Sequence, residues 1–456
     1  MYETRTIAQK FKLFTIILLP ILVTQLSLYA MNFFDTIMAG NAGTADLAGV
    51  AIGSSIWVPI LTGITGVLMA LSPMVAQLIG AKKDKEVPEL VRQGIYLSIA
   101  LSLLVAVIGL LLLDPVLNVL NVTAEVRHVA KYYLLTLGLG LIPLFMFNLI
   151  RCFIDALGQT KVSMFIILVT LPLNVIFNYL FIFGKLGFPA LGGIGAGLAS
   201  SLTYWLACAI ALMIISKFSP FKHYAIFSSW TAPSFPIWWE QLKIGVPIGF
   251  AIFFETSIFA AVTLFMTVYD TETIAAHQAA INFASFLYMV PLSIAMTLTI
   301  AAGFEIGGGR IRDAKAYAYI GISAGVAAAF AAGLILYMFD DAVARLYNAD
   351  PRVIELTKQF IFYAIFFQLA DGFGAPIQGA LRGYKDVNIT LIMALISYWV
   401  IGLPSGWLLA NFTLFGPFGY WIGLTIGLSA GAITLLARLL FLQKKLLKQS
   451  LSESAS

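Results

Sequence analysis

The sequence has little charge, little histidine and little cysteine for its 456 residues. Only 11% of the residues are charged and 60% are hydrophobic, whereas a soluble domain carries roughly 25% charge. No polar stretch is long enough to fold as a soluble domain, and the longest, residues 217–243, still contains three tryptophans. These deficits exclude a soluble protein with an added anchor, and they favour an all-α integral membrane protein.

Three further absences narrow the function. The basic segment Tyr2–Lys12 is followed by an apolar run without a small-residue cleavage pattern, so we expect no cleaved signal peptide. Cys152 and Cys208 lie in or at the edge of apolar stretches, so no disulfide framework is implied. The nucleotide-binding pattern Gly-x4-Gly-Lys-Ser/Thr does not occur, so ATP is not the direct energy source. With a net charge of only +5, we expect no nucleic-acid partner and no cofactor.

The apolar stretches predict twelve transmembrane helices. Most of the stretches exceed the ~20 residues that span a bilayer, so tilted or bent helices are expected. Pro20, Pro59, Pro143, Pro172, Pro247, Pro291 and Pro404 fall inside them and each invites a bend. The expected spans are residues 13–39, 47–80, 94–113, 127–150, 162–183, 194–216, 243–268, 275–304, 316–338, 354–380, 388–410 and 418–441.

The distribution of Lys and Arg predicts the orientation. With the N-terminus in the cytoplasm, 21 of the 27 basic residues fall in cytoplasmic segments and 6 in outer segments. Cytoplasmic loops of membrane proteins carry such an excess. We therefore expect a multi-pass protein of the inner (plasma) membrane with both termini in the cytoplasm.

The chain repeats itself at half its length. Pro20-Ile21 recurs 227 residues later at Pro247-Ile248, and Ile79-Gly80 recurs at Ile306-Gly307. Six spans, an even number, separate the start of one half from the start of the other, so both halves cross the membrane in the same orientation. The two halves therefore form an internal parallel repeat. The expected organisation is two six-helix lobes, residues 1–216 and 243–441, with a cytoplasmic linker 217–242 and a cytoplasmic tail 442–456.

Two acids lie where water should not reach. Glu255 follows Lys243 by 12 residues, and Asp371 lies 13 residues after Lys358 and 11 before Arg382. At ~1.5 Å per residue this is about half of a bilayer core, where an ionised acid costs at least a few kcal/mol. If the two acids face each other, either one could bind a proton, because ionising both together is unfavourable. Alternatively both could ligate Na⁺, with Gln368 supplying a further oxygen.

Asp35 is a third acid in an apolar stretch. Asn32 precedes it by about one turn, and Asn174, Asn178 and Thr203 are expected neighbours from the fifth and sixth spans. A cation or proton site in the first lobe is one interpretation. The alternative is a polar clamp between helices, which buried Asn and Thr often provide.

The sequence resembles the multidrug and toxic compound extrusion (MATE) transporters, most closely the NorM branch, over essentially its whole length. The resemblance rests on residues 33–40 (Phe-Phe-Asp-Thr-Ile-Met-Ala-Gly), 72–81 (Ser-Pro-Met-Val-Ala-Gln-Leu-Ile-Gly-Ala), 174–178, 192–197 and 379–383 (Gly-Ala-Leu-Arg-Gly). It implies export of organic, often cationic drugs and toxic compounds by antiport against Na⁺ or H⁺, with alternating access. It also implies that Asp35, Glu255 and Asp371 carry the coupling.

This chain departs from the family pattern at two positions. Phe367 stands where some relatives have Tyr, so a phenolic ligand is absent. Asn178 stands where other branches have a second acid of the first lobe.

Aromatic and methionine side chains are candidates for a substrate cavity. Aromatic faces suit flat organic cations, and flexible methionines suit an adaptable cavity. For any one of them, ordinary packing is the alternative. The candidates are Phe253, Phe254, Phe259, Tyr288, Phe366, Phe367, Met31, Met38 and Met289.

Two other classes of function compete with drug export. A lipid-linked saccharide flippase would line its cavity with Arg or Lys for pyrophosphate, whereas the central stretches here supply acids. An integral membrane enzyme would cluster His, Cys or acids near one interface, and the three histidines are scattered. The expected partners are therefore drugs and the lipid bilayer, the expected state is a monomer, and the protein is not expected to be an enzyme.

The orientation is testable by labelling single cysteines in a variant without Cys152 and Cys208. Cysteine at Ser229 should resist a membrane-impermeant thiol reagent applied to intact cells, whereas cysteine at Asn411 should react, because the charge bias places these positions on opposite sides. The reverse pattern of labelling would contradict the orientation.

Overall fold

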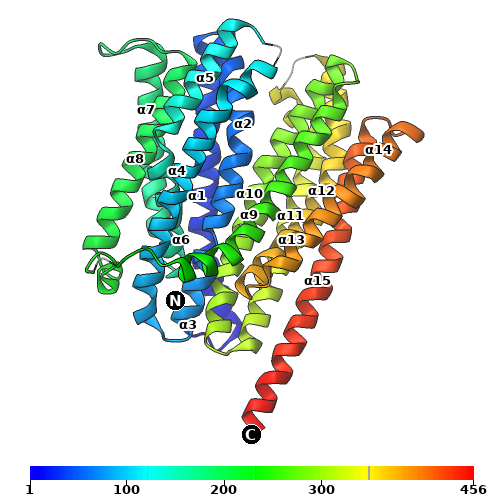
Figure 1. Ribbon diagram of the computed structural model, residues 1–456. Helices are drawn as coiled ribbons and strands as arrows, with labels where there is room; N and C mark the ends of the chain where they lie inside the picture. Colours follow the sequence, from blue (N-terminus) through cyan, green and yellow to red (C-terminus); the bar gives the residue numbers. More distant parts are fainter. Residues whose placement is uncertain (121, 230, 348–349, 456) are drawn as a thin grey trace. The chain divides into compact units, whose positions relative to one another are not determined.

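The computed structural model describes residues 1–120, 122–229, 231–347 and 350–455 and is helical, without strands, over them (Figure 1). The first part of the chain forms α1 (Ile7–Ala42), α2 (Thr44–Leu68), α3 (Leu71–Gly80), η1 (Asp84–Glu86), α4 (Val87–Val119), α5 (Ala124–Gly138), α6 (Leu141–Ala156), α7 (Thr160–Phe183), α8 (Gly193–Lys217) and η2 (Phe221–Tyr224). The second part forms α9 (Phe235–Met266), α10 (Thr271–Gly307), α11 (Ile311–Tyr347), α12 (Pro351–Gly383), α13 (Val387–Leu395), η3 (Ile396–Gly402), α14 (Leu403–Phe412) and α15 (Phe418–Ala455).

The helices account for the twelve expected membrane spans. Among the described residues, 11 helices are long and apolar enough to cross a membrane, and a bent pair, α5 with α6, makes the twelfth. The expected span 47–80 comprises α2 and α3, and the expected span 388–410 comprises α13, η3 and α14. The prediction of a polytopic helical membrane protein is confirmed.

Breaks in the spans have local causes. α5 and α6 meet at an angle of 52° where Gly140 packs against α8, and a Cβ at Gly140 would lie 2.8 Å from the Ser201 Cα. Pro143 follows in the first turn of α6, a position that tolerates a missing N–H. In the eleventh span, η3 is a π-helical segment that ends just before Pro404, because proline cannot donate the regular backbone hydrogen bond.

The chain packs into two compact units. Unit 1 comprises Met1–Leu22 and Phe250–Ser456, and unit 2 comprises Val23–Gly249. α1 and α9 each change unit within the helix, two residues after Pro20 and Pro247 respectively. These units are defined by packing, and the lobe boundaries at residues 216 and 243 remain a prediction.

Unit 2 is built from antiparallel and crossing helix pairs. α7 packs against α8, α2 and α8 pack against α5, and α6 packs against α4 and α8. The segment after η2 is tied to α4: the Gln93 amide donates to the Ala232 carbonyl (2.9 Å), and the Thr231 hydroxyl donates to Glu89 (3.0 Å). Much of the expected linker is therefore fixed to unit 2.

Unit 1 is centred on α12, which packs against α10, α11 and α15. The start of the chain is held to α11, where Lys10 pairs with Asp313 (3.0 Å) and the Thr4 and Tyr317 hydroxyls are 3.0 Å apart. Lys10 is buried although charged, and Asp313 and the Thr4 carbonyl satisfy its ammonium group.

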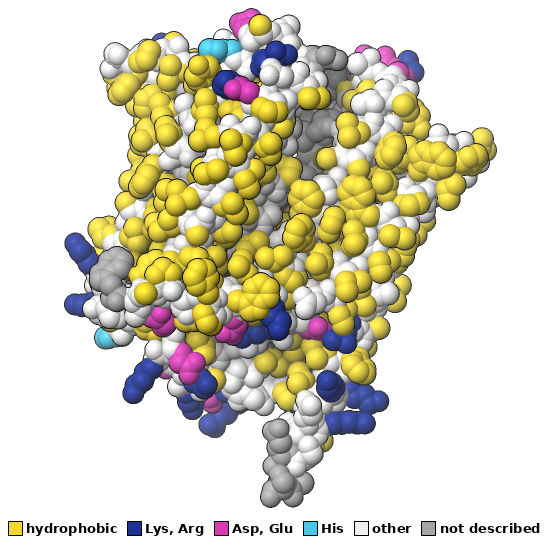
Figure 2. Space-filling view, viewed as in Figure 1, with side chains coloured by type: hydrophobic (Ala, Val, Ile, Leu, Met, Phe, Trp, Pro, Cys, Tyr) yellow, Lys and Arg dark blue, Asp and Glu magenta, His cyan; other side chains and the backbone are white. Residues whose placement is uncertain are grey.

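The face shown in Figure 2 fits a membrane environment in each unit. Hydrophobic side chains cover the middle of the outer helices, and basic side chains gather towards the helix ends. In unit 2 the exposed side chains include Leu103, Val107 and Leu111 of α4; in unit 1 they include Phe330 and Leu334 of α11. Lipid tails are the natural contact for such surfaces.

Small residues bring α12 close to its neighbours. A Cβ added at Gly379 would lie 2.2 Å from the Ala295 carbonyl oxygen of α10, and one at Gly372 would lie 2.4 Å from the Ala329 Cβ of α11. Membrane helices commonly pack through such small residues. This close approach positions the α12 side chains around Asp371, which adjoins Gly372.

The close packing predicts different effects for two Gly→Ala substitutions. Gly379→Ala should destabilise the protein by about 1–3 kcal/mol, because the new methyl group must push α12 away from α10. Gly109→Ala in α4, where nothing lies within 4 Å of the added Cβ, should be tolerated. Thermal unfolding of the two purified variants checks this, and equal melting temperatures would contradict the packing described here.

Candidate functional site

Unit 1 holds two acids from different helices. Glu255 lies in α9 and Asp371 in α12, and their exposed fractions are 7% and 2%. The two carboxyl groups interact electrostatically. Since both side chains carry the same charge when ionised, removing them from water together is costly. A proton or cation bound at the pair would lower this cost, and that role of the pair remains a prediction.

The two acids differ in their hydrogen bonds. The Tyr288 hydroxyl of α10 donates to Glu255 Oε1 over 3.2 Å. By contrast, Asp371 Oδ2 is buried and has no hydrogen-bond partner among the described residues. An unsatisfied buried oxygen is expensive. Asp371 therefore offers an oxygen without a partner among the described residues, in the same unit as Glu255.

Neutral oxygens and a cation surround this pair. The Tyr398 ring is buried and its hydroxyl interacts electrostatically with both acids. Arg382, also buried, interacts electrostatically with Glu255. Gln368 lies one turn before Asp371, and its amide donates to the Ala284 carbonyl of α10 (2.9 Å). The amide nitrogen of Gln368 is thus fixed, and its role as an ion ligand remains a prediction.

An aromatic layer lies one turn from the acids. Phe367 is 5% exposed, and its ring meets the rings of Phe259 and Trp421 at 5.5 and 6.0 Å. The Trp421 indole donates to His277 Nδ1 over 3.1 Å. Phe259 and Phe367, which sequence reasoning offered as cavity residues, pack here against each other.

The other expected cavity residues differ in exposure. Phe253 and Phe366 are exposed, Met31 is buried, and Phe254, Tyr288, Met38 and Met289 are half-buried. The Phe254 carbonyl accepts a hydrogen bond from the Trp399 indole, and Tyr288 contacts Glu255 as described. A substrate cavity formed by these side chains remains a prediction.

Unit 2 surrounds its acid with hydrogen-bond donors. Asp35 Oδ1 accepts from the Asn178 amide (2.5 Å), and Oδ2 accepts from the Ser200 hydroxyl of α8 (2.9 Å). Charge-assisted hydrogen bonds of this kind stabilise the ionised form. Sequence reasoning missed Ser200, although it precedes Thr203 by three residues and so shares its helix face.

A chain of amides and hydroxyls continues from Asp35. The Asn178 amide also donates to Asn174 Oδ1 (3.3 Å), and the Asn174 amide contacts the Thr203 hydroxyl (3.5 Å). The structure thus brings together three of the four expected neighbours of Asp35. The fourth, Asn32, is exposed and its amide donates to the Leu28 carbonyl of its own helix (3.4 Å).

The donor set limits what kind of ion fits. The described residues contain no group of three or more His, Cys, Asp or Glu side chains that could hold a metal ion. A transition metal therefore has no ligand cluster here. A proton needs only one carboxylate, and Na⁺ at Glu255 and Asp371 would have to take further oxygens from neutral groups.

Comparisons with known proteins agree on one family. A family model described as MatE matches residues 20–180 and 247–408. Curated relatives named probable multidrug resistance protein NorM are 62% identical in Oceanobacillus iheyensis (98% of this chain, 100% of the relative) and 53% identical in Bacillus subtilis (98% and 98%).

Solved structures share the fold. The eukaryotic MATE transporter AtDTX14 has a TM-score of 0.85 at 21% identity, covering 97% of this chain and 98% of that one. An outward-facing multidrug resistance MATE family transporter has a TM-score of 0.88 at 18% identity, covering 98% and 100%.

The geometry around Asp35 predicts a stability difference between two serines of α8. Ser200→Ala should cost about 1.5–3 kcal/mol, because it removes a donor from a half-buried carboxylate. Ser216→Ala should have little effect, since that exposed hydroxyl bonds only to carbonyls of its own helix. Thermal unfolding of both purified variants is the measurement, and an unchanged Ser200→Ala variant would contradict the hydrogen bond to Asp35.

Proposed function

The chain belongs to the MatE family, and on that premise we propose that it exports organic, often cationic compounds in exchange for Na⁺ or H⁺. It is a multidrug efflux transporter with many membrane spans, a transporter rather than an enzyme. The proposal adds the coupling: the Glu255–Asp371 pair takes up the ion whose gradient drives export.

One observation carries the coupling proposal: the buried oxygen of Asp371 has no partner among the described residues, and the carboxyl group interacts electrostatically with Glu255 of the same unit. A structural carboxylate in an apolar bundle normally finds donors, as Asp35 does. Arg382 interacts electrostatically with Glu255, but without a bound ion the Asp371 oxygen keeps the free-energy cost of burial without a donor. Binding one proton or one Na⁺ relieves that cost, which supports a loading and unloading site.

Exchange follows from competition for the same negative charge. A cationic drug near the empty pair is attracted by it, and uptake of a proton or Na⁺ removes the attraction. Because an ion shifts an equilibrium only through its different affinities for two states, drug and ion must weaken each other's binding reciprocally. Loading the ion from one side therefore releases the drug on that side.

Asp35 takes a different role in this proposal. Its two oxygens already have donors from Asn178 and Ser200, so its charge is held in place without an added ion. We assign it a second coupling position in unit 2, where uptake of a proton would require the Asn178 and Ser200 contacts to change.

We also propose the oligomeric state, the membrane location and the orientation of the transporter. The protein works as a monomer in the plasma membrane, with both termini in the cytoplasm and lipid around its apolar faces. The excess of Lys and Arg on one set of loops supports the orientation.

The test is ethidium export from vesicles containing the purified protein, under separately imposed Na⁺ and H⁺ gradients. One gradient should drive export. Asp371→Asn and Glu255→Gln should each reduce the driven rate at least about tenfold, equivalent to ~1.4 kcal/mol.

Glu355→Gln is the matched control, because this exposed acid lies on α12 as Asp371 does. It should retain the rate of the unmodified protein. Normal gradient-driven export in both Asp371→Asn and Glu255→Gln would refute the coupling role of the pair.

A further inference from the structure

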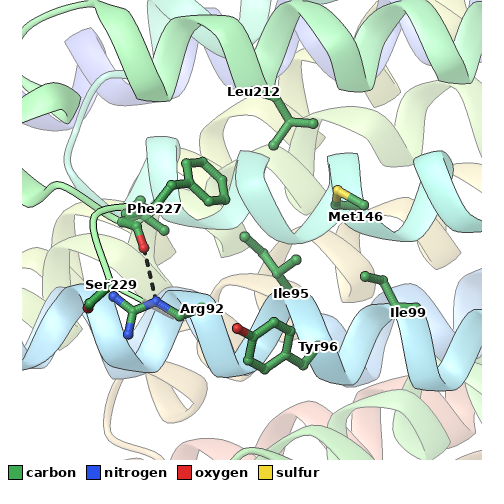
Figure 3. Close-up of a pocket in the computed structure, with 9 residues that line it drawn as sticks. Arg92, Ile95, Tyr96, Ile99, Met146, Leu212, Phe227 and Ser229 are labelled. Atoms are coloured by element: carbon green, nitrogen blue, oxygen red, sulfur yellow. Dashed lines mark hydrogen bonds between the residues drawn. The ribbon is translucent and has the colours of Figure 1, made fainter. Parts of the chain in front are cut away.

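A cavity of about 220 Å³ lies in unit 2, and its lining does not include Asp35, Glu255 or Asp371 (Figure 3). Side chains of Ile95, Tyr96 and Ile99 from α4 form one wall, Met146 of α6 and Leu212 of α8 form the opposite side, and Phe227 of the loop after η2 closes one end. We call it the α4–α8 cavity. No step of the proposed transport uses it.

The wall formed by the loop is fixed in place. Arg92 Nε donates to the Ile226 carbonyl over 3.0 Å, the contact drawn in Figure 3. The same guanidinium donates to Glu89 (2.5 Å) and to the Thr231 hydroxyl (3.1 Å). The charge of Arg92 is therefore compensated within the protein, and the space beside it is left to apolar side chains. A preformed apolar cavity suits an apolar ligand.

The α4 wall continues into the lipid-facing surface. Tyr96, Ile99, Leu103 and Val107 follow one another at spacings of three or four residues and so lie on one face of α4. Leu103 and Val107 are 52% and 56% exposed. The cavity is thus an inward extension of a surface that lipid tails cover.

The size of the cavity favours part of a lipid over a drug. Sites for drug-sized molecules usually enclose about 300–1,000 Å³, more than the 220 Å³ found here. A segment of one acyl chain fits this volume and can enter from the lipid side, leaving the rest of the molecule outside.

Basic residues adjoin the cavity at the polar end of unit 2. Lys217 ends α8 five residues after Leu212, about 7.5 Å further along the helix axis. Lys222 lies in η2, and both lysines are exposed. Juxtamembrane lysines attract anionic lipid headgroups.

We propose that the α4–α8 cavity binds an acyl chain of an anionic phospholipid, whose headgroup lies at Lys217 and Lys222. The chain packs against Ile99, Met146 and Leu212. The bound lipid supports the loop after η2 from the membrane side, while Arg92 and Glu89 hold the same loop from the protein side.

The test uses the full-length purified protein in mixed micelles with a phosphatidylglycerol that carries a photoreactive diazirine in its acyl chain. After illumination, mass spectrometry should place adducts on residues 95–99 of α4 and around Met146 and Leu212. Met146→Trp fills the cavity and should reduce these adducts at least about fivefold, because the site becomes overpacked. Leu103→Trp, on the same face of α4 but outside the cavity, should leave them unchanged.

A second arm tests the headgroup. Lys217→Gln combined with Lys222→Gln should lower the adduct yield of the phosphatidylglycerol probe to that of a phosphatidylcholine probe with the same chain. The proposal is overturned if adducts spread evenly along α4, if Met146→Trp leaves them unchanged in a variant with normal thermal stability, or if the two probes label the unmodified protein equally. Displacement of the lipid probe by ethidium would overturn it too, and would assign the cavity to drug.

Discussion

A carboxylate inside an apolar helix bundle needs a donor, a counter-ion or a proton, and this requirement governs the rest of the molecule. The bilayer offers none of these, so the protein must supply them from facing helices. At Asp35 it supplies an amide and a hydroxyl from α7 and α8. At Asp371 one oxygen has no such partner among the described residues, and in the proposed function the coupling ion takes that place.

The packing of the helices contributes to the difference between the surroundings of Asp35 and those of Asp371. Gly372 and Gly379 let α12 approach α11 and α10, and Asp371, which adjoins Gly372, is buried. The rings of Phe259, Phe367 and Trp421 pack together one turn from the acids along α9 and α12. In unit 2, Ser200 of α8 and Asn178 of α7 instead donate to Asp35. One fold, repeated, thus builds one acid site that is complete and another that is open.

The sequence predicted the spans and the repeat because both depend on local pattern. Pro20 and Pro247, 227 residues apart, indicated the duplication, and the two family matches begin at those same residues. Three of the four expected neighbours of Asp35 lie in its hydrogen-bonded chain.

Other features depend on contacts that no local pattern specifies. Periodicity does not tell which helices the start of α1 packs against, and residues 1–22 belong to unit 1. The break between α5 and α6 comes three residues before Pro143, where Gly140 meets α8. Ser200 was missed because the rotation of α8 about its axis relative to α1 is set by tertiary packing. Asn32 lies one turn before Asp35 on α1, but its amide donates to the Leu28 carbonyl.

The central claim is that the Glu255–Asp371 pair binds ion and drug in competition, and equilibrium binding measures it most directly. Ethidium fluorescence should be titrated with purified protein across pH and Na⁺ concentration. The account predicts that the coupling ion raises the Kd for ethidium, and that this dependence disappears in Asp371→Asn. A Kd that is indifferent to both ions, and is the same in Asp371→Asn, would contradict it.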